Sequence, residues 1–198
     1  MIRLVELLAI SSGQQLNMSR LGSHLGVDSK TIDRWLHLLN LMFLVDRIPA
    51  WHHSQLKRLV KTPKFHFLDS GLLSVLLRMD ANSINQNRSI LGSVLESFVY
   101  SEIVKAVALS NETTTVSHYR DKDGYEVDFV LERSWSQVVG IEVKASKTVQ
   151  VKDFRGLKRL MEATGKQFSC GILLHDGERI QQIAPKLYAM PISMLWKA

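Results

Sequence analysis

The stretch VVGIEVKAS, residues 138–146, reads as a β-strand that carries Glu142 and Lys144 two residues apart. Side chains alternate between the two faces of a strand, so this carboxylate and this amine share one face. One interpretation is a strand with one face in water, where such a pair is ordinary or forms a salt bridge. The other is a chemical site, in which the carboxylate binds a hard cation and the amine offsets negative charge in a transition state.

A second carboxylate lies in a predicted hairpin that precedes this stretch. Residues 113–120 and 125–132 have the character of strands, and they flank the turn sequence DKDG. Asp128 stands between Val127 and Phe129 in the second arm. Aspartate is disfavoured in strands, so Asp128 is out of place on propensity alone.

A third carboxylate lies in a predicted helix over residues 89–110, SILGSVLESFVYSEIVKAVALS. The apolar residues of this segment nearly encircle it, which indicates a helix buried on more than one side. Glu96 falls within the apolar set rather than on a polar face. Its carboxylate therefore needs a cation, a metal or hydrogen-bond donors, unless it lies at the rim with its tip in water.

These residues resemble the PD-(D/E)XK restriction-endonuclease-like superfamily, which has a Glu in a first helix, an Asp in a hairpin strand and E-x-K in the next strand. The whole chain is similar to the C-terminal part of AAA-type ATPase-like proteins of bacteria and archaea, where a winged helix precedes a nuclease-like domain of unknown function. The phrases that carry the resemblance are PKFHFLDSGLL, LGSVLESFVYSEI, YRDKDGYEVDFVLE and GIEVKAS. Val127 replaces the proline of the PD pair.

The resemblance implies a site that hydrolyses phosphodiesters with Mg²⁺ or Mn²⁺. It implies Asp128 and Glu142 as metal ligands, with the backbone carbonyl of Val143 as a third oxygen. Glu96 would bind the metal directly or through water, and Lys144 would be the catalytic lysine. The implied function is a metal-dependent nuclease-like protein that acts on or near DNA. The alternative is a catalytically inactive nuclease fold that serves as an interaction or regulatory module of an AAA-type ATPase system.

No phosphate-binding loop of the form G-x-x-x-x-G-K-[ST] occurs in the sequence. The segment EATGKQF around Lys166 lacks the earlier glycine and the hydroxyl residue of that pattern. We therefore expect a C-terminal fragment or a shortened relative; an AAA-type ATPase module in trans is a candidate partner, whose existence the sequence leaves open.

The residue pattern in the first half of the chain is typical of a helix-turn-helix. Residues 17–45 contain two short amphipathic helices joined near Gly26, and Asp28 or Ser29 is suited to cap the second helix. Residues 43–51 and 63–69 then predict a two-stranded wing.

A polar, turn-forming run at residues 78–89 separates the two halves. We predict a winged-helix domain over residues 1–80 and a PD-(D/E)XK nuclease-like domain over residues 81–198. The predicted fold class is α/β, or α+β overall, with an N-terminal winged helix followed by a restriction-endonuclease-like mixed β-sheet flanked by helices.

Basic residues predict contact with nucleic acid in several places. Lys57, Arg58, Lys61 and Lys64 lie in a stretch without Asp or Glu, which is otherwise a basic surface loop. Arg120 is a candidate phosphate contact or a surface cation. The second helix of the helix-turn-helix projects Lys30, Thr31, Arg34 and His37, as in DNA-binding examples. Asp33 in the same set would repel phosphate, so that helix equally suits docking to protein.

Composition bounds the remaining possibilities. The chain has 198 residues, 45% of them hydrophobic, and a net charge of +6, which favours polyanionic partners. Its single cysteine, Cys170, has no partner for an internal disulfide, and the first residues lack a secretory cleavage site. We expect a cytoplasmic protein without a membrane span. The sequence leaves the oligomeric state open.

Overall fold

The computed structural model describes residues 2–52, 62–80, 84, 88–134 and 137–197, and they form two compact units. Unit 1 comprises the described part of Met1–Ile48 and of Thr62–Ser101. Unit 2 comprises the described part of Pro49–Lys61 and of Glu102–Ala198.

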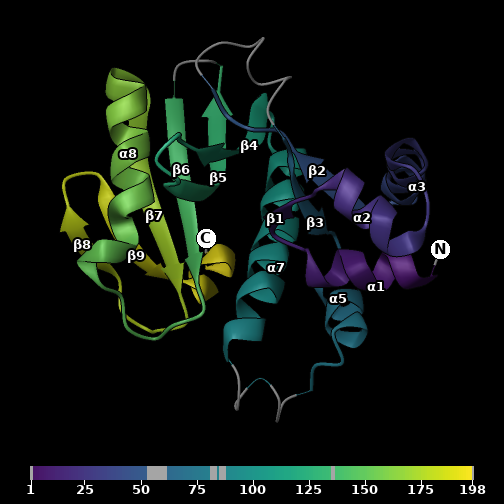
Figure 1. Cartoon of the computed structure of the whole chain (residues 1–198). Coiled ribbons are helices and arrows are strands. Elements are labelled where there is room, and N and C mark those ends of the chain that lie inside the picture. The colour runs from purple at the N-terminus through teal and green to yellow at the C-terminus, as the bar shows by residue number, and fades with distance from the viewer. Residues whose placement is uncertain (1, 53–61, 81–83, 85–87, 135–136, 198) are drawn as a thin grey trace. The chain divides into compact units, whose positions relative to one another are not determined.

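Unit 1 consists of helices and a small antiparallel sheet (Figure 1). Its helices are α1 (Ile2–Ile10), α2 (Met18–Leu25), α3 (Ser29–Leu41), α5 (Ser70–Leu76) and the first part of α7 (Arg88–Leu109). Its described strands are β1 (Gln14–Gln15), β2 (Val45–Ile48) and β3 (Lys64–Phe67), in the order β1-β3-β2. The predicted pair of helices followed by two strands of a wing is present, and β1 adds to the wing a strand that the sequence did not predict.

The turn between α2 and α3 follows from local side-chain chemistry. Asn17 accepts a hydrogen bond from the backbone N–H of Arg20 at the start of α2, and Asp28 accepts one from Thr31 at the start of α3. The backbone hydrogen bond from Thr31 holds the pKa of Asp28 below its ordinary value. Gly26 ends α2 with a φ of 67°, a left-handed conformation that glycine adopts readily.

The core of unit 1 collects apolar side chains from each of its helices and from two strands of its sheet. Its largest fully buried members are Leu4, Leu8, Ile32, Leu36, Phe65, Phe67 and Leu73. Helix α3 therefore buries one stripe and leaves its opposite face outward.

Helix α7 contributes to both units, because the division between them falls between Ser101 and Glu102. The assignment of residues 1–80 and 81–198 to separate domains stays a prediction. What the division shows is that Glu96 belongs to unit 1.

Unit 2 contains, in the part of the chain that the structure describes, a six-stranded mixed sheet in the order β4-β5-β6-β7-β9-β8. Its strands are β4 (Thr114–Arg120), β5 (Glu126–Arg133), β6 (Gln137–Lys144), β7 (Phe168–His175), β8 (Gln181–Ala184) and β9 (Leu187–Pro191). Strands β6, β7 and β9 run parallel, and the other neighbouring strands pair antiparallel. Three 3₁₀ segments and one further helix complete the unit: η1 (Val151–Phe154), α8 (Arg155–Thr164), η2 (Gly165–Gln167) and η3 (Ile192–Trp196).

The predicted fold class is confirmed: a helical region with a small antiparallel sheet is followed by a mixed sheet flanked by helices. The predicted order of helix, three strands, helix and strand is present from α7 to β7. Strands β8 and β9 extend the sheet beyond that prediction.

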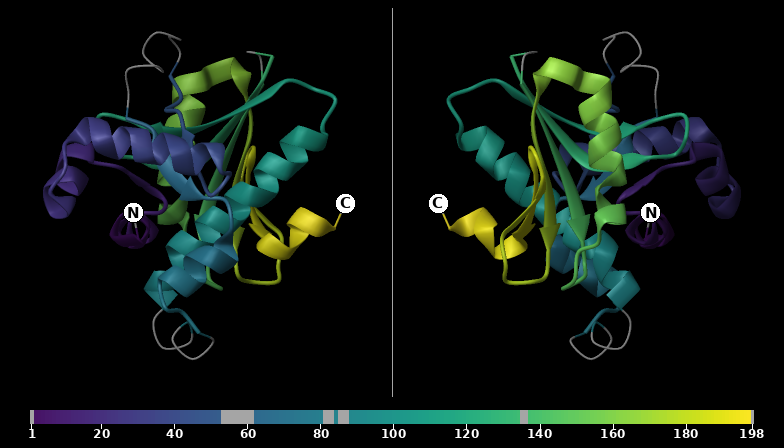
Figure 2. Two further views of the ribbon diagram at one scale, coloured as in Figure 1. Left: turned by 90° about the vertical axis from the view of Figure 1, so that its right-hand side faces the viewer. Right: turned by 90° about the vertical axis from the view of Figure 1, so that its left-hand side faces the viewer.

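Helix α8 lies along the sheet of unit 2, as both views of Figure 2 show. Two glycines permit its close approach. A Cβ added to Gly140 on β6 would lie 2.8 Å from carbons of Leu157 and Leu160, and one added to Gly156 would lie 1.8 Å from the carbonyl oxygen of Glu126. The face of β6 that contains Gly140 is therefore the face covered by α8.

None of the helices that the structure describes is both long enough and apolar enough to cross a membrane.

Candidate active site

Strand β6 places Glu142 and Lys144 on the same face as Gly140, which is the face toward α8. The predicted shared face is therefore present. Oε1 of Glu142 lies 3.2 Å from Nζ of Lys144, so the two side chains form an ion pair. The Glu142 side chain is 13% exposed and that of Lys144 is 41% exposed. The amine can therefore meet a solute from solvent, while the carboxylate is mostly covered.

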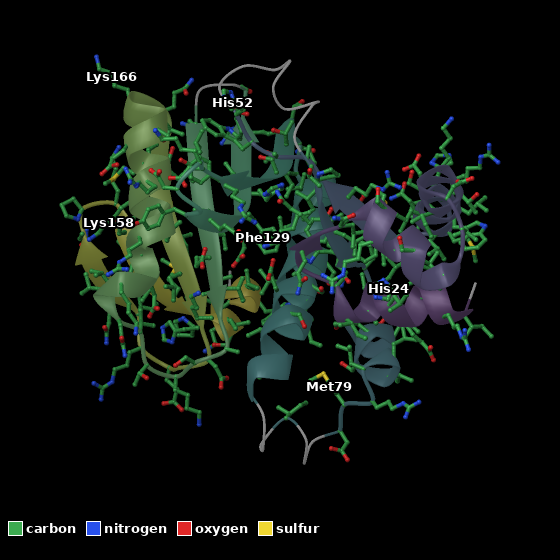
Figure 3. All side chains as sticks on the ribbon, viewed as in Figure 1. His24, His52, Met79, Phe129, Lys158 and Lys166 are labelled. Atoms are coloured by element: carbon green, nitrogen blue, oxygen red, sulfur yellow. The ribbon has the colours of Figure 1, made fainter. Side chains whose placement is uncertain are left out.

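Strand β5 has an irregularity at Asp128. Opposite His118 of β4, strand β5 carries two residues, Asp128 and Phe129, between regular pairs on either side. An extra residue in one strand is a β-bulge, a feature that redirects side chains and is common near active sites. Phe129, labelled in Figure 3, is completely buried, and Asp128 is almost so.

The Asp128 carboxylate reaches strand β6 beyond the last residue pair of the β5–β6 ladder, Phe129 with Ile141. Its Oδ2 accepts a hydrogen bond of 2.9 Å from the backbone N–H of Val143. Val143 stands between Glu142 and Lys144 in the chain. The bulge and this hydrogen bond thus bring the third predicted residue to the E-x-K segment.

A fourth ionisable residue, Asp153, acts electrostatically on the same lysine and was not predicted from the sequence. It lies in η1, and its Oδ2 accepts a hydrogen bond of 2.8 Å from the backbone N–H of Gln150 in a capping box. The local signal was the Asp three residues after Gln150, which marks the start of a helical segment and carries no information about Lys144.

The charges around Lys144 explain its titration. Partial burial by itself would lower the pKa of Lys144, and it is opposed first by Glu142, through its charge and its hydrogen bond. Asp128 and Asp153 add smaller contributions in the same direction, and the pKa of Lys144 lies above its ordinary value. Lys144 is therefore a permanent cation at neutral pH, suited to attract an anionic group.

The oxygen donors at this place agree in kind with a hard divalent cation. Mg²⁺ is held in proteins by one or two carboxylates and keeps several waters, so Asp128 and Glu142 are a sufficient protein contribution. Among the described residues, no group of three or more His, Cys, Asp or Glu side chains is placed to hold one metal ion. The described residues therefore do not form a site with three carboxylate ligands. The assignment of Asp128 and Glu142 as metal ligands remains a prediction.

The carboxylate of Glu96 contacts basic side chains of unit 1. It forms an ion pair with Lys64 of β3, and its Oε1 lies 3.5 Å from Nε2 of the fully buried His66. A Cβ added to Gly13 would lie only 3.0 Å from Oε2 of Glu96. Lys64 is thus a cation partner of Glu96, one of the kinds of partner that its apolar surroundings call for, and the role of Glu96 as a metal ligand remains a prediction.

The neighbours of His66 continue as a buried polar network. Oγ of Ser97 lies 3.2 Å from Nδ1 of His66 and 2.9 Å from Oγ of Ser12. Ser97 is completely buried, so this Ser–His contact joins α7 to β3 and does not present a nucleophile to solvent.

Two family models match separate parts of the chain. The family model described as "Domain of unknown function (DUF4143)" matches residues 91–195. The chain belongs to the DUF4143 family. A second model, "Domain of unknown function (DUF8612)", matches residues 1–83. The candidate site therefore lies within the DUF4143 match, and the helix-turn-helix lies within the other.

Two curated relatives align with almost the whole chain. They are the proteins named Uncharacterized protein Mb2031c of Mycobacterium bovis and Uncharacterized protein Rv2008c of Mycobacterium tuberculosis, each 27% identical over 189 residues, or 96% of this chain. The chain spans 41% of the length of each. Among solved structures, the assembly of Thermococcus gammatolerans McrB AAA+ hexamers with bound McrC contains a chain that is 13% identical, with a TM-score of 0.38, over 50% of this chain and 27% of that one.

A pocket of about 460 Å³ opens in the DUF4143 region at the carboxyl ends of β6 and β7. His175, which lies opposite Lys144 in the sheet, lines it together with Lys147 and Arg179. Nδ1 of His175 accepts a hydrogen bond from Gly177, and Nε2 lies 3.1 Å from the carbonyl oxygen of Arg179. His175 thus shapes the loop that borders the pocket.

The predicted nucleic-acid contacts lie in different surroundings. Lys57, Arg58 and Lys61 lie outside the described residues, and their roles stay predictions. Lys64 is buried and neutralises Glu96, which leaves less of its charge for a polyanion. Arg120 is half exposed and lies 2.8 Å from Glu126.

Proposed function

We propose that the DUF4143 region carries a PD-(D/E)XK-type site that hydrolyses phosphodiester bonds of DNA with Mg²⁺ or Mn²⁺. The observation that supports this most directly is the hydrogen bond from Val143 to Asp128, which joins the hairpin carboxylate to the E-x-K segment. The sequence pattern and this spatial arrangement are independent, since a strand register one residue different would have separated them.

In this proposal Asp128 and Glu142 hold the cation, with the backbone carbonyl of Val143 as a further oxygen. When bound, such an ion neutralises charge on the phosphate and lowers the pKa of a water molecule. Lys144 orients the attacking water and stabilises the negative charge that develops on the phosphoryl oxygens. The water oxygen forms a bond to phosphorus, one P–O ester bond breaks, and the leaving oxygen acquires a proton.

The exposure and the charge of Lys144 suit this role. The amine is nearly half exposed and is a permanent cation, while Glu142, which fixes its position, is mostly covered. A charged group held in place by a neighbouring carboxylate requires little reorganisation when a substrate arrives.

Cleavage of supercoiled plasmid DNA in Mn²⁺ and in Mg²⁺ tests the proposal. We expect nicked product from the wild-type chain and at least about a 100-fold lower rate for Lys144→Ala, since loss of one charge-stabilising group typically has that effect. Lys147→Ala, three residues farther along the chain and exposed, is the matched control and should keep activity. Equal rates for wild type and Lys144→Ala would assign any cleavage to a contaminant.

A second function is favoured by the ion pair itself. Glu142 already pairs with Lys144, and the described residues offer no cluster of three metal-ligating side chains. A nuclease fold without turnover, serving an AAA-type ATPase module in trans, fits these facts. Calorimetry with Mn²⁺ distinguishes the two functions: absence of heat with the wild-type chain, together with unchanged DNA affinity in Asp128→Asn, would favour the inactive module.

A further inference from the structure

Helix α3 ends in a Schellman motif whose left-handed residue is a phenylalanine. The N–H of Leu44 donates to the carbonyl of Leu39 at 3.1 Å, and the N–H of Phe43 donates to that of Asn40 at 2.9 Å. These are the two hydrogen bonds of the motif. Phe43 occupies the position where glycine is strongly preferred, and its φ is 56°.

This choice of residue does not help the fold. A non-glycine residue is strained in the left-handed region because its Cβ approaches the following carbonyl. The Phe43 side chain is also 81% exposed, the second most exposed of the large apolar residues described. It therefore gains little from burial while imposing strain, which points to a role in contact with another molecule.

Phe43 is not isolated on α3. Leu38, Leu41 and Met42 are each at least half exposed, and together with Phe43 they form one apolar patch at the end of the helix. Residues 38, 41 and 42 have the three- and four-residue spacing of a single helical face. Toward the start of α3 the same side of the helix carries exposed Lys30, Arg34 and His37. We call these seven residues the α3 surface; its first half is basic and its second half is apolar.

We propose that the α3 surface binds a helix of a partner protein whose contacting face carries carboxylates at one end and apolar residues at the other. The charge pattern selects this occupant, since acidic residues would face Lys30 and Arg34 while apolar ones cover Phe43. The proposal concerns unit 1 and does not depend on the site in unit 2.

A second copy of the chain and DNA each match the α3 surface less well than such a partner helix does. A second copy of the chain, paired antiparallel along α3, would place the basic half of each helix on the apolar half of the other. Overlap of the apolar ends alone would join only four apolar side chains of each copy, far fewer than the about 20 residues a side of a typical stable interface. DNA offers phosphates and base edges, against which four apolar side chains find few partners. The negative charge of Asp33 is no argument against DNA, because Arg47 forms an ion pair with it at 2.9 Å.

Binding of synthetic peptides by the full chain tests the proposal. The probe is a labelled helical peptide of about 20 residues whose contacting face carries glutamates in one half and leucines in the other; the control peptide has lysines in place of the glutamates. By fluorescence anisotropy we expect the glutamate peptide to bind at least about 10-fold more tightly than the lysine peptide. Lys30→Glu with Arg34→Glu should reverse that preference. Equal binding of both peptides, or none, overturns the proposal.

Replacement of Phe43 by glycine separates binding from folding. Phe43→Gly relieves the left-handed strain, so thermal unfolding should occur at the same temperature or up to about 4 °C higher. The same variant should bind the glutamate peptide at least about 10-fold more weakly. A lower unfolding temperature would make Phe43 a packing residue and overturn the proposal. Two further results would overturn the proposal. One is a concentration-dependent dimer, detected by sedimentation velocity, that Phe43→Gly abolishes. The other is binding of duplex DNA that is lost in Phe43→Gly.

Discussion

The carboxylate of Asp128 accepts a hydrogen bond from the backbone N–H of Val143, the residue between Glu142 and Lys144. This contact replaces the next rung of the β5–β6 ladder, whose last regular pair is Phe129 with Ile141. The strands thus separate at the place where three ionisable groups meet.

Asp128→Asn should therefore affect the site more than the fold. The amide oxygen of Asn can still accept from Val143, so we expect the free energy of unfolding to change by less than about 1 kcal/mol. Loss of the charge should weaken Mn²⁺ binding at least about 10-fold in calorimetry. Asp123→Asn, in the exposed turn of the same hairpin, is the matched control. Unaltered Mn²⁺ affinity in Asp128→Asn would remove this residue from the ligand set.

Glu142→Gln should lower the pKa of Lys144. Partial burial depresses that pKa, and Glu142 is the first of the groups that overcome the depression. In the wild type the folded-state pKa exceeds the unfolded value, so the stability from Lys144 is fully present below about pH 10.5 and declines as pH rises through the folded-state pKa. Titration of the lysine side-chain resonances by NMR measures the shift. A pKa of Lys144 that stays raised in Glu142→Gln would transfer the effect to Asp128 and Asp153.

The buried pair of Lys64 and Glu96 should be a stability element of unit 1. Lys64→Met leaves the Glu96 carboxylate without that cation in a covered place, and we expect a loss of about 3 kcal/mol in urea unfolding. Lys64→Met combined with Glu96→Gln should lose less than the sum of the single changes. Lys105→Met, which removes an exposed partner of Glu102, should lose less than about 1 kcal/mol. Additive losses in the double variant would show that the pair is not coupled.

The same pair shows what a local sequence pattern can and cannot predict. The apolar stripe around Glu96 indicated that this carboxylate needs a cation, a metal or hydrogen-bond donors, and Lys64 is such a cation. The contact of Lys64 with nucleic acid, predicted from its basic neighbours in the chain, stays a prediction, while the structure shows Lys64 buried and paired with Glu96. Whether a strand residue points inward depends on what packs against it, which a local charge pattern does not contain.

Local chemistry was the most predictable part of the fold. The caps at Asp28 and Gly26, and the shared face of Glu142 and Lys144, follow from residue types and strand alternation. The bulge at Asp128 and the approach of Asp153 could not be predicted, because they result from pairing and packing between distant segments. Strands β8 and β9 were missed because they are short and join through Pro185 and Lys186 rather than through Asn-Gly or Asp-Gly.

The basic segment offers a test that needs no knowledge of its conformation. If Lys57, Arg58 and Lys61 each neutralise one phosphate, replacing all three by Ala should reduce the slope of log K against log salt for duplex DNA by about 2.7, at 0.9 for each contact. Lys64 is left unchanged, because its replacement would disturb Glu96 and confuse folding with binding. Fluorescence anisotropy with a labelled duplex between about 50 and 200 mM salt measures the slope. The triple variant Lys152→Ala, Lys158→Ala and Lys166→Ala removes the same charge from unit 2 and controls for the net charge of the chain. An equal reduction in both variants would indicate a general effect of charge, whereas a slope that changes in neither would exclude both segments from the DNA contact.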